Sequence, residues 1–185
     1  MMKRIYALSL ASLLWANAAF ADEQALQSFE TCSLITSEYL TVLQLASRGF
    51  EREALKDSLP GISDRARNRV DALYEMIRQD GLTETYSTIH SEYARCARKV
   101  YQRTGLPPKG TREAHFHFCA GENKVRYEIA MAAFVNAPLK EVRRQLHPQH
   151  QQVADTIYNM HEKEGVTAVL DSLASELKFC INNDL

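Results

Sequence analysis

The chain contains 185 residues, of which 45% are hydrophobic and 24% are charged. These fractions match ordinary globular proteins, so they exclude a disordered chain, a collagen-like chain or a coiled-coil fibre. With 22 basic and 23 acidic residues, the formal net charge is −1. A charge this small argues against a general nucleic-acid binder and against a protein that coats anionic membranes.

The first 21 residues have the pattern of a cleavable export signal. Two basic residues lie near the start, a mainly apolar run follows over residues 5–15, and residues 19–21 read Ala-Phe-Ala, a small-x-small cleavage site. The apolar run is shorter than the roughly 20 residues that a membrane-spanning helix needs, and no later segment is apolar enough to span. We therefore expect cleavage near Ala21, a periplasmic or secreted location, and no transmembrane segment in the mature chain.

An internal repeat covers most of the remaining chain. Shifted by 84 positions, residues 74–96 match residues 158–180 at seven of 23 places, and a shift of 87 aligns Cys32 with Cys119. The second copy has therefore lost about three residues. A fixed internal period is the sequence signature of a repeat architecture. The seven matched pairs are Tyr74 and Tyr158, Met76 and Met160, Gly81 and Gly165, Thr83 and Thr167, Ser91 and Ser175, Glu92 and Glu176, and Cys96 and Cys180.

A short segment rich in helix breakers separates the two copies. It reads Gly-Leu-Pro-Pro-Lys-Gly and is the natural position for a linker. The predicted organisation is a signal peptide at residues 1–21, a first helical repeat at 22–104, the linker at 105–110 and a second helical repeat at 111–185.

Each copy is predicted to contain four helices. Apolar residues recur at steps of three and four over residues 82–100 and again over residues 166–180, which is typical of amphipathic helices. Thr83 and Thr167 are expected to cap these two helices at their N-termini. The prediction is an all-α fold in which two tandem, disulfide-clamped four-helix repeats pack into one helical body.

All four cysteines lie after the predicted signal peptide, and an even count in an oxidising compartment favours two structural disulfides. Their spacings match neither a redox nor a zinc motif. In each copy, one cysteine lies on the apolar face of the first helix and the other on that of the last. The repeat therefore predicts that Cys32 pairs with Cys96 and that Cys119 pairs with Cys180. Bridges between the copies and four buried free thiols are the alternatives.

Four histidines are candidate metal ligands. His115 and His117 form a His-x-His pair beside a cysteine, but residues two apart on a helix point about 200° away from each other. They can share a metal ion only if this segment is extended; the alternative is a helix start with one solvated histidine. His147 and His150 lie in a predicted turn, where the alternatives are solvent exposure and a weak copper or zinc site.

Three further side chains are candidates for ligand binding. His161 aligns with Ile77 of the first copy, a predicted core position. There it can act as a buried ligand or proton acceptor, or it can be satisfied by a backbone partner. Tyr74 and Tyr158 can line a ligand cleft, or they can anchor the edge of the core through the ring and the hydroxyl.

Neither a nucleophile elbow, nor a zinc-protease motif, nor a glycine-rich phosphate loop occurs in the sequence. We therefore expect an exported, non-catalytic helical binding protein of the bacterial envelope, which neutralises a toxin or an enzyme or assists envelope assembly. Its expected partner is another envelope protein, with no cofactor. The alternative is a periplasmic carrier of a metal or small ligand, and the third possibility is an exported enzyme with scattered catalytic residues.

Overall fold

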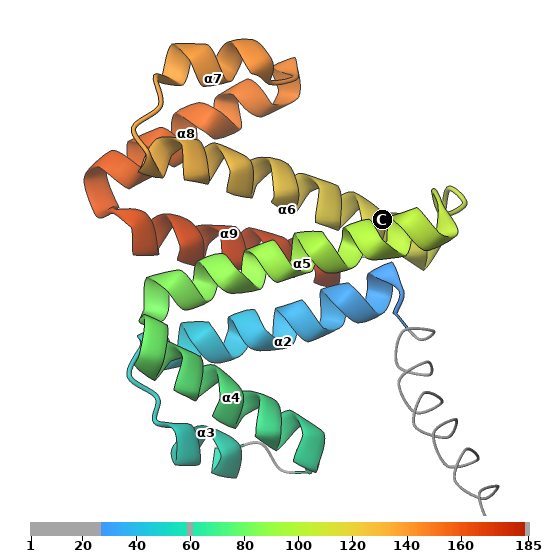
Figure 1. Cartoon of the computed structure of the whole chain (residues 1–185), viewed down its shortest axis with the longest axis vertical. Helices are drawn as coiled ribbons and strands as arrows, with labels where there is room; N and C mark the ends of the chain where they lie inside the picture. Colours follow the sequence, from blue (N-terminus) through green and yellow to red (C-terminus); the bar gives the residue numbers. More distant parts are fainter. Residues whose placement is uncertain (1–26, 59–60, 184–185) are drawn as a thin grey trace, which may run out of the picture.

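The computed structural model describes residues 27–58 and 61–183 (Figure 1). These residues form eight α-helices and no strand, which confirms the all-α prediction. The predicted signal peptide lies outside the described residues. Within the described ranges, every helix is too short or too polar to cross a membrane. The helices are α2 (Phe29–Ser47), α3 (Arg52–Ser58), α4 (Asp64–Asp80), α5 (Leu82–Thr104), α6 (Arg112–Phe134), α7 (Leu139–Gln145), α8 (Pro148–Glu164) and α9 (Val166–Asn182).

Four long helices, α2, α5, α6 and α9, form the centre of the molecule and all pack against one another. The helices α3 and α4 extend from α2 and α5 at one end of the view, and α7 and α8 extend from α6 and α9 at the other end (Figure 1). Along the chain, helix lengths of 19, 7, 17 and 23 residues are followed by lengths of 23, 7, 17 and 17.

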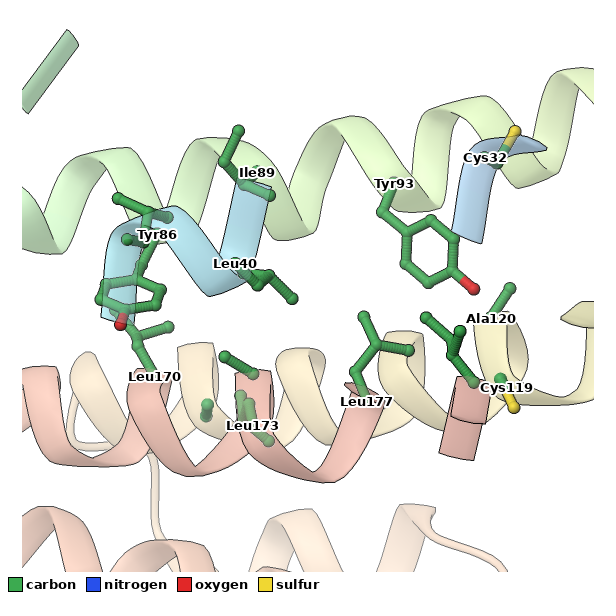
Figure 2. Packing of buried hydrophobic residues seen from close by; sticks show 14 of the residues in the cluster. Cys32, Leu40, Tyr86, Ile89, Tyr93, Cys119, Ala120, Leu170, Leu173 and Leu177 are labelled. Carbon is green, nitrogen blue, oxygen red and sulfur yellow. The ribbon is translucent and has the colours of Figure 1, made fainter. Parts of the chain in front are cut away.

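The hydrophobic core lies where the four long helices meet, and Figure 2 shows their apolar side chains directed into this shared interior. The core positions on α5 and α9 recur at intervals of three and four residues, as one face of a helix requires. Each large apolar side chain contributes roughly 1.5–3 kcal/mol when it is fully buried. Labelled members of this core are Leu40 on α2, Tyr86, Ile89 and Tyr93 on α5, and Leu170, Leu173 and Leu177 on α9.

Two disulfides join the long helices in pairs. The Cys32–Cys96 bridge connects α2 to α5, and the Cys119–Cys180 bridge connects α6 to α9. The Cα atoms are 5.9 Å apart in the first bridge and 5.8 Å apart in the second. The pairing predicted from the repeat is therefore confirmed.

The sequence-based prediction of helix caps at Thr83 and Thr167 is wrong. Gly81 and Gly165 occupy the cap positions, with φ angles of 84° and 85° that a glycine adopts readily because it has no Cβ. Each helix begins one residue before its threonine, so the threonine lies in the first turn. The two threonine hydroxyl oxygens are 2.9 Å apart and form a hydrogen bond that joins the starts of α5 and α9.

A carboxylate from α6 caps the start of α2. Glu113 accepts hydrogen bonds from the backbone N–H groups of Phe29 and Glu30, at 2.9 and 3.2 Å, and Ser28 caps the same turn from within the chain. The first N–H groups of a helix have no partner inside it, and negative charge is favourable there. This contact fixes the start of α2 against the start of α6.

Candidate functional site

An open groove of about 490 Å³ lies between α6 and α9. The two helices run antiparallel, since the disulfide joins Cys119 near the start of α6 to Cys180 near the end of α9. On α6, the wall of the groove follows a ridge of residues four apart, from Phe118 through Glu122 to Arg126. This ridge covers two helical turns, or about 12 Å. From α9, the groove is lined by Leu173, Ser175, Glu176, Leu177, Phe179 and Cys180.

Two exposed phenylalanines lie beside the groove. The exposed fraction is 53% for Phe118 and 72% for Phe179. Each directly precedes a cysteine of the bridge between α6 and α9, and neighbouring residues on a helix are rotated by about 100°. When the cysteine points into the core, the residue before it therefore lies at the edge of the buried face of the helix. The disulfide fixes the two helices relative to each other at the positions that carry these phenylalanines.

The other disulfide has no such aromatic pair. Thr31 directly precedes Cys32, and Arg95 directly precedes Cys96. Phenylalanine is therefore not a requirement of a bridge in this setting. Two large aromatic side chains exposed beside one groove form a candidate binding surface.

The floor of the groove contains a buried amide. Asn123 on α6 is only 3% exposed, and its Oδ1 lies 3.0 Å from Nδ1 of His90 on α5. Within the described part of the chain, the Nδ2 atom of this asparagine has no hydrogen-bond partner. A buried donor without a partner costs about 1–3 kcal/mol. The polar packing is therefore incomplete directly below the groove.

His90 itself is fully buried, and its ring stacks on Tyr127 with 5.6 Å between the ring centroids. Burial lowers the pKa of His90 to about 4, against the opposing effect of its hydrogen bond to Asn123. The imidazole is therefore neutral at physiological pH. The hydroxyl of Tyr127 extends the polar layer to Ser87 and Ser91, at 2.6 and 3.2 Å.

An ion cluster lies at one end of the groove. Arg126 is paired with Glu122 one turn earlier on α6, and its Nε donates to Glu176 on α9 at 2.7 Å. His150 on α8 places its Nε2 3.0 Å from the other oxygen of Glu122. The guanidinium therefore connects the two helices that form the groove.

The same contacts favour the charged forms of Glu122 and Arg126. Burial alone would raise the pKa of Glu122, but the hydrogen bonds from Arg126 and His150 outweigh it and lower the pKa. Burial alone would lower the pKa of Arg126, but the hydrogen bond to Glu122 and the charge of Glu176 raise it. The charges at the groove are therefore set by neighbouring side chains.

The imidazole rings of His115 and His117 do not point toward a common position. Both residues lie on α6, where His115 donates from Nε2 to the carbonyl of Cys180 at 2.8 Å. The ring of His117 instead lies against Phe29 and Tyr101, with centroid distances of 4.8 and 6.0 Å. The two imidazoles therefore have separate neighbours.

The side chains of the other two candidate metal ligands have different surroundings, although both residues lie at the start of α8. His147 is exposed at the start of α8, while His150 is buried against Glu122. Across the described residues, no group of three or more His, Cys, Asp or Glu side chains is placed to hold a metal ion.

The two candidate tyrosines hold loops in place. The Tyr74 hydroxyl donates to the carbonyl of Phe50, and the Tyr158 hydroxyl donates to the carbonyl of Ala137 at 2.9 Å. Each accepting residue lies shortly after a long helix, α2 or α6. Burial raises the pKa of both tyrosines, so both remain protonated donors.

Two of the three ligand-binding candidates lie together. Tyr158 and His161 line one hollow of about 720 Å³, formed by the end of α6, the start of α7 and α8. The ring of His161 also contacts Phe134, with 5.2 Å between the centroids. Tyr74 lies on α4, in the other half of the molecule.

The sequence-based reasoning missed Phe118, Phe179, Asn123 and His90. A usable signal was the Phe-Cys dipeptide, which occurs at both ends of the Cys119–Cys180 bridge. Comparison of the chain with protein-family models, curated proteins and solved structures finds no match. The function is therefore inferred from the geometry of the groove.

Proposed function

We propose that the chain is an exported, non-catalytic binding protein, and that it binds another protein of the bacterial envelope through the groove between α6 and α9. The observation that carries this proposal is the pair of exposed phenylalanines, Phe118 and Phe179, held beside an open groove by a disulfide. Aromatic side chains are enriched at the centres of protein interfaces and supply much of the binding energy there. Neutralisation of a toxin or an enzyme, or assistance in envelope assembly, is the proposed class of activity.

Export is part of the proposal. It is supported by the basic head, apolar run and cleavage site of residues 1–21, and by the two disulfides. Disulfides form and persist in oxidising compartments such as the periplasm.

We also propose that the chain is a tandem duplication, with repeats at 22–104 and 111–185 joined by the linker at 105–110. The succession of helix lengths and the two equivalent bridges support it. So do the aligned residues Tyr74 and Tyr158, whose hydroxyls bind carbonyls at aligned positions. On this alignment, Thr31 and Arg95 of the first copy stand where the second copy has the groove phenylalanines, so on this proposal only the second copy carries the binding groove.

The test is to compare capture of envelope proteins by the native chain and by a groove variant. In the variant Phe118→Thr/Phe179→Arg, each phenylalanine is replaced by the residue at the aligned position of the first copy. We expect the native chain to retain a partner in stoichiometric amount, and the variant to bind that partner at least tenfold more weakly, since hot-spot truncations cost this much or more. The readout is the dissociation constant for the captured partner.

The matched control is Leu106→Ser/Val135→Thr, which removes exposed apolar surface outside the groove. This control is expected to bind as the native chain does. Equal capture by the native chain and the groove variant would contradict the proposed binding surface.

A small-ligand carrier is the second proposal. One observation favours it: the hollow of about 720 Å³ that Tyr158 and His161 line together with Asn136 and Asn159. This volume lies in the range typical of small-molecule sites. The groove is preferred because its exposed aromatic side chains are suited to a protein partner.

A further inference from the structure

We propose that the groove between α6 and α9 receives two turns of an amphipathic helix from the partner, and that this helix carries a basic side chain. The inference rests on the proposed function, because it names the class of partner for the same groove. It follows from the shape of the groove, its apolar lining and its charge.

The shape of the groove suits a third helix. Its walls are ridges of residues four apart on two antiparallel helices, and helices pack by placing such ridges into grooves. The ridge from Phe118 to Arg126 is about 12 Å long, which equals two turns of an α-helix. A docked helix of this length presents anchors at positions i, i+3, i+4 and i+7.

The two exposed phenylalanine rings supply the contacts for those anchors. Leu173 and Leu177 lie in the groove wall on α9, and both are almost completely buried by the fold itself. Phe118 and Phe179 lie beside them with much of their surface exposed. Apolar side chains of a partner helix would cover these rings, which removes apolar surface from water on both molecules.

The charge of the groove favours a basic partner. Its charged lining residues are the carboxylates Glu122 and Glu176 and the guanidinium of Arg126, and Glu122 is also bound by His150 beside the groove. The guanidinium is already bound by both carboxylates, whereas the side chain of Glu176 remains 50% exposed. The cation Lys178 does not line the groove, and its Nζ lies 3.5 Å from Thr41 Oγ1 on α2. A Lys or Arg of the partner therefore finds an accessible carboxylate at Glu176.

A selection from a library of displayed helical peptides of random sequence tests the inference. The library is selected on the native chain, on Glu176→Lys and on Phe118→Thr/Phe179→Arg. On the native chain we expect enrichment of peptides that combine apolar residues at i, i+3 or i+4, and i+7 with a Lys or Arg. The best such peptide should bind Glu176→Lys at least tenfold more weakly, and changing its basic residue to Glu should restore binding to that variant.

Glu176→Gln provides a second variant in case the lysine disturbs Arg126. It should reduce the preference for basic peptides without reversing it. Circular dichroism checks that each variant is folded. The inference would be overturned if the selected peptides were acidic, uncharged, or extended and proline-rich. It would also be overturned if no peptide were enriched. A dimer of the native chain, detected by sedimentation and abolished in the phenylalanine variant, would overturn it as well.

The two proposals fail in different ways. If the phenylalanine variant loses the captured envelope partner while Glu176→Lys binds it normally, the groove is the binding surface but the basic helix is wrong. If neither variant changes the affinity for that partner, both proposals are wrong.

Discussion

Removal of the Cys119–Cys180 disulfide is expected to lower the free energy of unfolding by about 4 kcal/mol. The bridge closes a loop between residues 61 positions apart, and a cross-link of this span restricts the unfolded chain by about that free energy in the chain-entropy model. Cys119→Ala/Cys180→Ala is the suitable variant, because serine would bury a hydroxyl at the fully buried position 119. Urea denaturation of the native chain and the variant measures the difference.

The first bridge offers a matched comparison. Cys32 and Cys96 are 64 positions apart, so Cys32→Ala/Cys96→Ala should lose a nearly equal free energy. A loss below about 1 kcal/mol in both variants would contradict the structural role assigned to the bridges.

Acidification from pH 6.5 to pH 4 is expected to destabilise the fold by about 3 kcal/mol through His90 alone. Burial lowers the pKa of this histidine from 6.5 to about 4 in the folded chain. As the pH falls, the unfolded chain therefore binds the proton first, and stability decreases across this window. Each pKa unit corresponds to about 1.4 kcal/mol, which gives the stated magnitude. This contribution is fully present about one pH unit above 6.5, and it is lost as the pH falls from there toward 4.

The measurement is the free energy of unfolding by urea at several pH values for the native chain and His90→Gln. Whatever its stability at pH 7, the variant should have a flatter pH dependence between 6.5 and 4. His147→Gln changes an exposed histidine and is the matched control. All three proteins have the same carboxylates, so the difference in slope between the native chain and His90→Gln isolates His90. Identical slopes for the native chain and His90→Gln would rule out a neutral buried imidazole.

The disulfides and the helical fold could be predicted because local spacing determines them. Each cysteine shares a periodic apolar face with its neighbours, and that face must point into the core. The internal repeat then selected one pairing among three. Helix starts were less predictable, since the left-handed conformation of Gly81 and Gly165 moved each start one residue ahead of the expected threonine cap.

The polar layer below the groove could not be predicted, because its members meet only in three dimensions. His90 and Asn123 are 33 positions apart and lie on different helices. No sequence motif connects them, and each alone resembles an ordinary polar residue of an amphipathic helix. Their burial follows from the packing of α5 against α6.

The groove could be predicted from the sequence only in part. Helical phase places Phe118 and Phe179 beside inward-facing cysteines, so the sequence contains their approximate orientation. Their exposure depends on whether another element covers them, and helical phase does not contain this information. The sequence did contain one indication of a special role. Phenylalanine precedes both cysteines of the second bridge, whereas Thr31 and Arg95 precede the cysteines of the first.

Hydrogen–deuterium exchange tests the central claim, that binding occurs between α6 and α9, most directly. Exchange is measured on the chain alone and with the captured partner or the selected peptide bound. The account predicts slower exchange confined to residues 118–126 and 173–180, which form the two walls of the groove. Slower exchange along α3 and α4 or along α7 and α8, with no change at the groove, would contradict it.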